Sequence, residues 1–362
     1  MTTNGATPVQ DRSSKHKINL RDSRPVFSNA NGSIQEFTTN ELPMLKNLSL
    51  QKIELNPDCI LEPKWFVNCN AIAYVLTGNT LVRTLDSASD MSTFTVSEGQ
   101  MFHVHSGALF TVENTSSTTA ATFLICARHE HPKEFTLSRS AAAFTDAVLA
   151  NTFVRRRSVF AKYSPRSTTP PNPTIIKRSG PAEVPTNAKW PHPNRFDVED
   201  MQAPTFAAGV GSAKKARAQY WKILTNIAMY SLRIEDKGMR EPHWHPDTVE
   251  MGYIKEGHAR MSIMDRMGHY PHQIEVIQPG LNGEGFVHPQ SVKAGEEIPI
   301  HFLIFFDQPM PKDVGFRQAG TVMSRRVLAA AFGMKEAELP EFPYDNEDPL
   351  IVLKKNVADP VV

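Results

Sequence analysis

The chain has 362 residues, of which 39 are basic and 38 are acidic, so its formal net charge is +1. This balance gives no electrostatic reason to expect nucleic acid or an anionic membrane as a partner. No apolar run is long enough to span a bilayer, and the polar N-terminus lacks the apolar segment of a signal peptide. The three cysteines, Cys59, Cys69 and Cys126, lack metal-motif spacing and predict buried thiols in a cytoplasmic protein.

An internal repeat organises the chain. EPKWFVNCNAIAYVLTGNTLV (62–82) aligns without gaps to EPHWHPDTVEMGYIKEGHARM (241–261), at an offset of 179 residues. The same offset relates FLI at 123–125 to FLI at 302–304, and VLANTF at 148–153 to VLAAAF at 327–332. Chance does not hold one register over such a span, so the sequence predicts a tandem duplication.

The repeat and the composition predict five regions. They are a disordered N-terminal segment (1–25), a first domain (26–160), a Pro-rich extended linker (161–195), a second domain (196–345) and a C-terminal tail (346–362).

Within each domain the pattern predicts strands followed by a helical piece. In the second domain the short β-rich runs are MYSLRI (229–234), VEMGYI (249–254), ARMSIM (259–264) and HFLIFF (301–306). SRRVLAAAFGM (324–334) has apolar residues at helical spacing and reaches a glycine, as a helix does at its end.

Three potential metal ligands lie close together in REPHWHPDTVEMG. His243 and His245 are two residues apart, which on a strand points both imidazoles to the same face. Pro246 and Asp247 begin a turn, and Glu250 follows on the returning strand. Two nitrogens and a carboxylate suit Mn, Fe, Co, Ni, Cu or Zn. A lone pair of surface histidines is the alternative, which the nearby Glu250 disfavours.

The segment HWHPDTVEMGYIKEG closely resembles the first motif of the cupin family, with its paired histidines, following Glu250 and later Gly257. The whole chain, over about residues 30–345, resembles a bicupin of the oxalate decarboxylase type. The resemblance implies a mainly β protein of two tandem double-stranded β-helix (cupin or jelly-roll) barrels with short C-terminal helices. It also implies a metal, usually manganese, held by three histidines and one glutamate.

The resemblance further singles out Arg260, at a point where oxalate-degrading bicupins have an arginine facing the cavity. Its guanidinium would bind a substrate carboxylate in a bidentate manner. An outward-facing strand residue is the alternative for Arg260.

The fourth ligand implied by the family is less well defined. We predict His288, although it falls about three residues early when counted from Gly280, and Gln290 takes the expected place when counted back from HFLIFF. His272, an ordinary loop role for His288, and a three-ligand site completed by water remain alternatives.

The first repeat has lost its ligands. At the same offset Lys64 stands for His243, Phe66 for His245, Ala71 for Glu250 and Leu81 for Arg260, and Phe110 takes the place of the histidine of the second motif. Such a set cannot hold a divalent metal. His103 and His105 form another His-x-His pair without a visible carboxylate, and we expect them to be structural or surface residues.

The resemblance implies an enzyme acting on a small carboxylic acid, with oxalate as the family's usual substrate, manganese as a Lewis acid and a glutamate on a lid as proton donor; Glu284 is one candidate for that glutamate. A non-catalytic binding or scaffold protein, or another cupin dioxygenase or isomerase, remains an alternative. A homo-oligomer is a further expectation, since family members commonly assemble.

Overall fold

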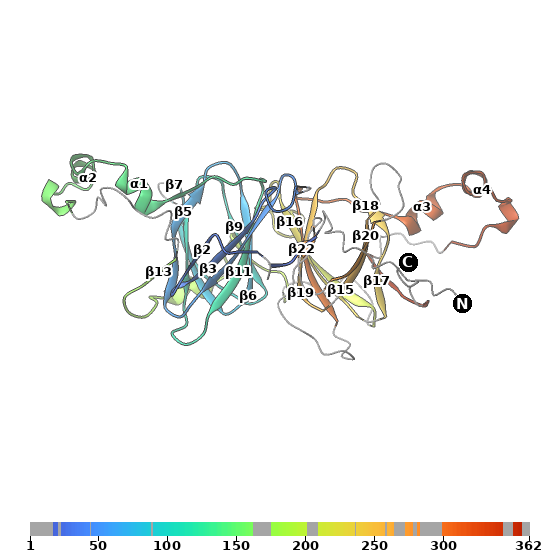
Figure 1. Ribbon diagram of the computed structural model, residues 1–362, viewed down its shortest axis with the longest axis horizontal. Coiled ribbons are helices and arrows are strands. Elements are labelled where there is room, and N and C mark those ends of the chain that lie inside the picture. Colours follow the sequence, from blue (N-terminus) through green and yellow to red (C-terminus); the bar gives the residue numbers. More distant parts are fainter. Residues whose placement is uncertain are drawn as a thin grey trace, which may run out of the picture.

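The protein is described by a computed structural model. It describes residues 17–20, 23–43, 45–87, 90–161, 175–200, 209–235, 237–257, 259–263, 272–277, 281–282, 299–342 and 350–356. Two β-barrels lie side by side along the long axis, and each carries a pair of helices at its outer end (Figure 1). The prediction of a mainly β protein with two barrels and short helices at the end of each is confirmed.

The first barrel consists of two antiparallel sheets. One has the strand order β14-β9-β6-β11-β4-β3-β2, and the other has the order β12-β5-β10-β7-β8 with β13 added to β5. The strands are β2 (Phe27–Asn29), β3 (Gly32–Phe37), β4 (Ser49–Leu55), β5 (Cys59–Phe66), β6 (Ala71–Thr77), β7 (Asn79–Ser87), β8 (Asp90–Ser97), β9 (Gln100–Val104), β10 (Leu109–Asn114), β11 (Ala121–Ala127), β12 (Glu134–Thr136), β13 (Ile175–Lys177) and β14 (Arg195–Asp197).

The second barrel repeats the central part of this arrangement. Its main sheet has the order β1-β22-β19-β23-β16-β15, and three two-stranded ladders join β17 to β25, β18 to β24 and β20 to β21. The strands are β1 (Lys17–Ile18), β15 (Gly211–Ala216), β16 (Ala228–Ile234), β17 (Gly238–Arg240), β18 (His243–Trp244), β19 (Glu250–Glu256), β20 (Ala259–Ile263), β21 (His272–Ile277), β22 (Leu281–Asn282), β23 (Ile300–Phe306), β24 (Val314–Gly315) and β25 (Ile351–Leu353). The four runs predicted as strands lie on β16, β19, β20 and β23.

Equivalent glycines make the tight turn that follows β6 in the first barrel and β19 in the second. Gly78 and Gly257 both have φ +84°. A Cβ at Gly78 would lie 2.9 Å from the Cα of Ala121, and one at Gly257 would lie 2.8 Å from the carbonyl oxygen of Pro299. Both the backbone conformation and the close approach require glycine at these turns.

Each barrel ends in a helical arm, and the two arms project from opposite ends of the molecule (Figure 1). The first arm contains α1 (Leu137–Ala142), α2 (Asp146–Thr152) and η2 (Arg157–Val159), and the second contains α3 (Phe316–Val322), α4 (Arg325–Phe332) and η4 (Glu336–Glu338). The predicted helix SRRVLAAAFGM is α4: the hydroxyl of Ser324 accepts from the N–H of Val327 at its start, and Gly333 ends it with φ +65°. Both arms expose apolar side chains, Phe153 and Phe332 among them.

The N-terminal segment and the linker both add strands to the barrels. Lys17–Ile18 pairs with β22, and Leu20 is buried, so the predicted disorder of residues 1–25 does not extend to this stretch. Ile18 and Leu20 both pack into the apolar core between the barrels. β13, in the linker, pairs with β5, and β14, where the linker meets the second domain, pairs with β9, so both strands run along the first barrel.

The barrels pack against each other through equivalent faces. One apolar core contains Tyr74 and Leu124 of the first barrel together with their counterparts Tyr253 and Leu303 of the second. The inside of each barrel forms a separate apolar core. All three cysteines are buried and unpaired, as predicted. Among the residues described, no helix is both long and apolar enough to cross a membrane.

His103 lies buried on β9 beside this junction. Its ring is 4.4 Å from that of His105 and 6.3 Å from that of Trp221, measured between centroids. Within the described part of the chain, neither of its ring nitrogens has a hydrogen-bond partner. Burial, with a smaller effect of His105, lowers the pKa of His103 to about 3. His103 is therefore a neutral core residue, not a surface one.

We expect His103 to make the fold sensitive to acid. Because its pKa is lower in the folded than in the unfolded state, its contribution to stability is complete above about pH 6.5 and is lost as the pH falls towards 3. Between pH 6.5 and 5 the loss should be about 2 kcal/mol.

Urea unfolding of the wild type and of His103→Gln, each at about pH 7 and about pH 5, measures this difference. The variant should lose less stability between the two pH values than the wild type. An identical loss in both proteins would show that His103 is not the titrating group.

Candidate metal centre

Backbone carbonyls fix the orientation of both histidines in the second barrel. His243 lies on β18, which pairs with β24, and its Nδ1 donates to the carbonyl oxygen of Glu241 at 2.8 Å. Nδ1 of His245 donates to the carbonyl oxygen of Lys312 at 3.0 Å. Since a carbonyl oxygen can only accept, Nδ1 carries the hydrogen in both rings, and Nε2 is the atom free to bind a metal.

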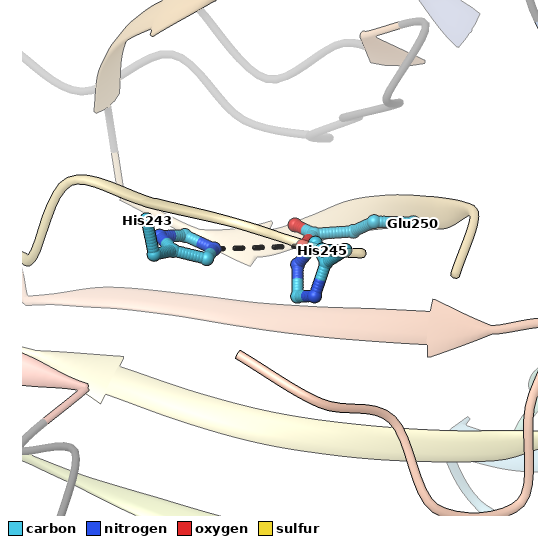
Figure 2. A group of neighbouring side chains, drawn as sticks. All are labelled: His243, His245 and Glu250. Carbon is cyan, nitrogen blue, oxygen red and sulfur yellow. Dashed lines mark hydrogen bonds and ion pairs between the residues drawn. The ribbon is translucent and has the colours of Figure 1, made fainter. Parts of the chain in front are cut away.

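Glu250 begins β19 and brings its carboxylate to these two rings. Its Oε2 lies 2.7 Å from Nε2 of His245 and 3.9 Å from Nε2 of His243. One ligand atom from each of the three residues lies within 4.8 Å of the other two. Figure 2 shows Glu250 reaching from its strand towards both imidazoles. The structure thus brings together three of the four residues predicted as metal ligands.

Asp313, which the sequence reasoning missed, completes the surroundings of His245. Its Oδ1 lies 3.0 Å from Nδ1 of His245, and its Oδ2 lies 3.4 Å from Arg240. The repeat contained a signal that could have found it, because the 179-residue offset relates Asp313 to Glu134, another carboxylate. A carboxylate behind a ligating imidazole orients the ring and increases its basicity.

The pKa shifts of His245, Glu250 and Asp313 all favour a positive charge between the two carboxylates. Burial lowers the pKa of His245, but its contacts with the carboxylates of Asp313 and Glu250 outweigh this effect and raise the pKa to about 10. Burial would raise the pKa of Glu250, but its contacts with His243 and His245 hold it well below its usual range. Burial opposes the ionisation of Asp313 too, yet its contact with His245 keeps its pKa low. One buried and one half-buried carboxylate, Glu250 and Asp313, thus face the imidazole of His245.

This donor set fits a divalent transition metal. Two imidazoles with Nε2 turned inward and one ionised carboxylate converge, and both Nδ1 atoms already have acceptors. Sulfur ligands are absent from the group, so the set is unlike a structural zinc site. That these residues bind a metal stays a prediction.

Other predicted site residues fall outside the part of the chain that the structure describes. His288, Gln290 and Glu284 are among the residues left out. Arg260 and His272 lie on β20 and β21, where only the backbone is described. The roles of Arg260 and His288 therefore remain predictions.

In the first barrel the equivalent position is filled by the chain's own cation. Lys64 is 1 % exposed, and its Nζ lies 2.6 Å from Oε2 of Glu134 and 3.1 Å from Oε1 of Gln51. The ammonium also lies 5.3 Å from the ring centroid of Phe66 and 5.9 Å from that of Phe110. Cation–π contacts and a carboxylate satisfy this charge. These side chains leave no donor set for a metal.

The comparisons with known proteins agree with this fold. A family model described as cupin matches residues 18–157 and 200–339. The chain therefore belongs to the cupin family and is a bicupin, as its resemblance implied.

Two curated relatives are oxalate decarboxylases by name. The chain is 27% identical over 252 residues to oxalate decarboxylase OxdC of Bacillus subtilis, covering 66% of this chain and 62% of that protein. It is 21% identical over 280 residues to a probable oxalate decarboxylase of Arthroderma benhamiae, covering 72% of this chain and 63% of that protein. The matches thus span less than two thirds of either relative.

Solved structures share the fold. A structure of Bacillus subtilis oxalate decarboxylase at pH 4.6 matches with a TM-score of 0.75 and 23% identity, covering 94% of this chain and 88% of that one. A structure from a study of the Mn(II) centres of the same enzyme matches with a TM-score of 0.75 and 23% identity, covering 94% of this chain and 89% of that one.

We expect Asp313 to strengthen metal binding through His245. In Asp313→Asn, the imidazole loses the negative charge 3.0 Å from its Nδ1, so the Kd for Co(II) should rise about 10- to 100-fold. Competition with a coloured chelator measures the Kd. Asp58→Asn, which alters an ion pair with Arg178 in the first domain, is the matched control and should leave the Kd unchanged. Equal Kd values for wild type and Asp313→Asn would contradict this role.

Lys64 should stabilise the first barrel as an internal counter-ion. Lys64→Met leaves the carboxylate of Glu134 without its cation, and the free energy of unfolding should fall by roughly 3 kcal/mol. The double variant Lys64→Met with Glu134→Gln removes both charges and should recover most of that loss. Urea unfolding compares the three proteins. A double variant no more stable than Lys64→Met alone would rule out charge pairing as the cause.

Proposed function

We propose that the protein is a metal-dependent bicupin that acts on a small carboxylic acid, with one active site in its second domain. The observation that carries the proposal is the convergence of His243, His245 and Glu250 in that barrel. The similarity to two oxalate decarboxylases supports oxalate as the substrate and decarboxylation as the reaction. Manganese is the proposed metal, with Fe, Zn, Ni, Co and Cu as alternatives.

Each residue of the site has a proposed part. His243, His245 and Glu250 would hold the metal together with His288, and the bound metal would act as a Lewis acid on a substrate carboxylate. Asp313 and the carbonyl of Lys312 keep His245 in the tautomer that presents Nε2. Arg260 would bind the substrate's second carboxylate through its guanidinium and stabilise charge that develops during the reaction.

The two proposed domains have different roles. The first domain (26–160) is degenerate and lacks metal ligands, and the second (196–345) carries the site. One alternative is a bicupin that binds a ligand or acts as a scaffold without catalysis. Lys64 favours this alternative, because it occupies the place of a metal ligand in the first barrel and pairs with Glu134 there. Metal loading and product analysis separate the two functions.

Protein loaded with manganese should convert oxalate to formate and carbon dioxide. His245→Ala should reduce the rate at least 100-fold, because it removes a metal ligand and the partner of Glu250. His105→Gln, which changes the His-x-His pair of the first barrel, is the control and should retain the wild-type rate. Formate and hydrogen peroxide are measured together, since peroxide would indicate oxidation in place of decarboxylation.

Two results would decide against this function. Wild-type protein that takes up no manganese would contradict a metal-dependent enzyme. Protein that binds manganese and oxalate but releases neither formate nor peroxide would favour the binding protein.

A further inference from the structure

Equivalent residues of the two repeats meet as an ion pair where the barrels join. Arg128 and Asp307 are related by the 179-residue offset, as are Asn47 and Asn226. Nε of Arg128 donates to the carbonyl oxygens of Asp307 at 2.8 Å and Asn226 at 3.1 Å. Its Nη1 donates to the carbonyl oxygen of Asn47 at 3.2 Å, and its Nη2 lies 3.5 Å from Oδ2 of Asp307. Arg128 therefore binds two backbone carbonyls and one carboxylate across the junction, together with one carbonyl of its own domain.

Asp307 in turn holds the residue that precedes Glu250. Its Oδ1 accepts from the backbone N–H of Val249 at 2.8 Å, and its own N–H donates to the carbonyl of Val249 at 3.3 Å. The ladder between β19 and β23 continues from there with the pairing of Glu250 and Phe306. Oδ2 of Asp307 accepts from Nδ2 of Asn47 at 2.9 Å. Asp307 is 3 % exposed, and Asn47 and Arg128 of the first domain both place a donor beside its Oδ2.

We propose that the first domain, which has lost its own ligands, positions Glu250 of the second domain through Arg128 and Asn47 acting on Asp307. This inference rests on the proposed metal site. Arg128 and Asn47 bind the carboxylate of Asp307 from the first domain, and that carboxylate fixes the start of β19 through the N–H of Val249. Asp307 and Arg128 are thus positioning residues for a ligand that neither of them touches.

The second domain supplies the carboxylate of the Arg128–Asp307 pair and the first domain supplies the guanidinium, and this arrangement supports the proposed role. Of the two side chains in the pair, only the carboxylate of Asp307 can accept the N–H of Val249, because a guanidinium offers donors alone. In the first repeat, Arg128 occupies the place of Asp307, and its backbone N–H donates to the carbonyl of Asn70, the counterpart of Val249. The carboxylate therefore stands on the half that carries the ligands, and the cation stands on the half that has lost them.

Two full-length variants test the proposal. Arg128→Met removes the cation, and Asn47→Gly is the milder change, because glycine accepts the φ of +62° and only the side-chain donor to Asp307 is lost. Arg178→Met is the matched control: Arg178 also binds a carboxylate, that of Asp58 at 2.9 Å, and a backbone carbonyl, that of Asn114 at 2.7 Å, but within the first domain and its linker.

Two readouts are compared with the Tm of each protein. Hydrogen exchange of the metal-free proteins, followed by mass spectrometry on peptides that cover residues 247–252, reports the hold on Val249 and Glu250. The Kd for Co(II), from competition with a chelator, reports the consequence for the ligand set. Arg128→Met and Asn47→Gly should exchange faster in these peptides and should bind Co(II) about tenfold more weakly. Arg178→Met should change neither quantity, even where it lowers the Tm.

Unchanged exchange and an unchanged Kd in Arg128→Met and Asn47→Gly would overturn the proposal, as would the same weakening in Arg178→Met. Wild-type protein that binds no Co(II) would contradict the proposed function instead. The exchange result would then still decide whether the first domain holds Val249 and Glu250 in place.

Discussion

A charge buried inside a β-barrel must find an opposite charge, and the two halves of this protein meet that requirement in different ways. In the first barrel the ammonium of Lys64 lies beside Glu134 and balances its charge. The second barrel places Glu250 and Asp313 on either side of His245, and the proton on that imidazole carries the compensating charge. A divalent metal bound at His243, His245 and Glu250 would supply the same compensation with two charges.

The duplication makes this contrast a matched one, because the same fold surrounds both positions. At the positions of His243, His245 and Glu250 the first barrel has Lys64, Phe66 and Ala71, and the ammonium of Lys64 packs against the rings of Phe66 and Phe110. Both halves have a carboxylate at the next equivalent position, Glu134 and Asp313. The first barrel therefore has a similar carboxylate but a cation in place of the proposed ligands. Its remaining contribution reaches the second barrel across the junction, where Arg128 meets Asp307.

Much of the fold and the heart of the site could be predicted from the sequence because both depend on local patterns. The 179-residue offset revealed two similar domains, and the His-x-His spacing with a nearby Glu250 marked residues that a single turn brings together. Asp313 and Glu134 could not be recognised in this way, because strands that are distant in the sequence bring them to their partners. β24, next to Asp313, pairs with β18, and β12, which carries Glu134, pairs with β5. The sequence left open whether His103 is a structural or a surface residue, and the structure shows a buried one that packs near Trp221 of the second domain. Arg260 and His288 stay predictions that rest on the family resemblance.

We expect the duplicated chain to hold one metal, in its second barrel. Anomalous diffraction from crystals of the full chain grown with manganese, recorded on both sides of the manganese absorption edge, would locate it. One manganese peak should lie within bonding distance of Nε2 of His243, Nε2 of His245 and the carboxylate of Glu250, and none beside Lys64. A peak beside Lys64, or fully ordered His243, His245 and Glu250 side chains with no peak between them, would show that this assignment is wrong.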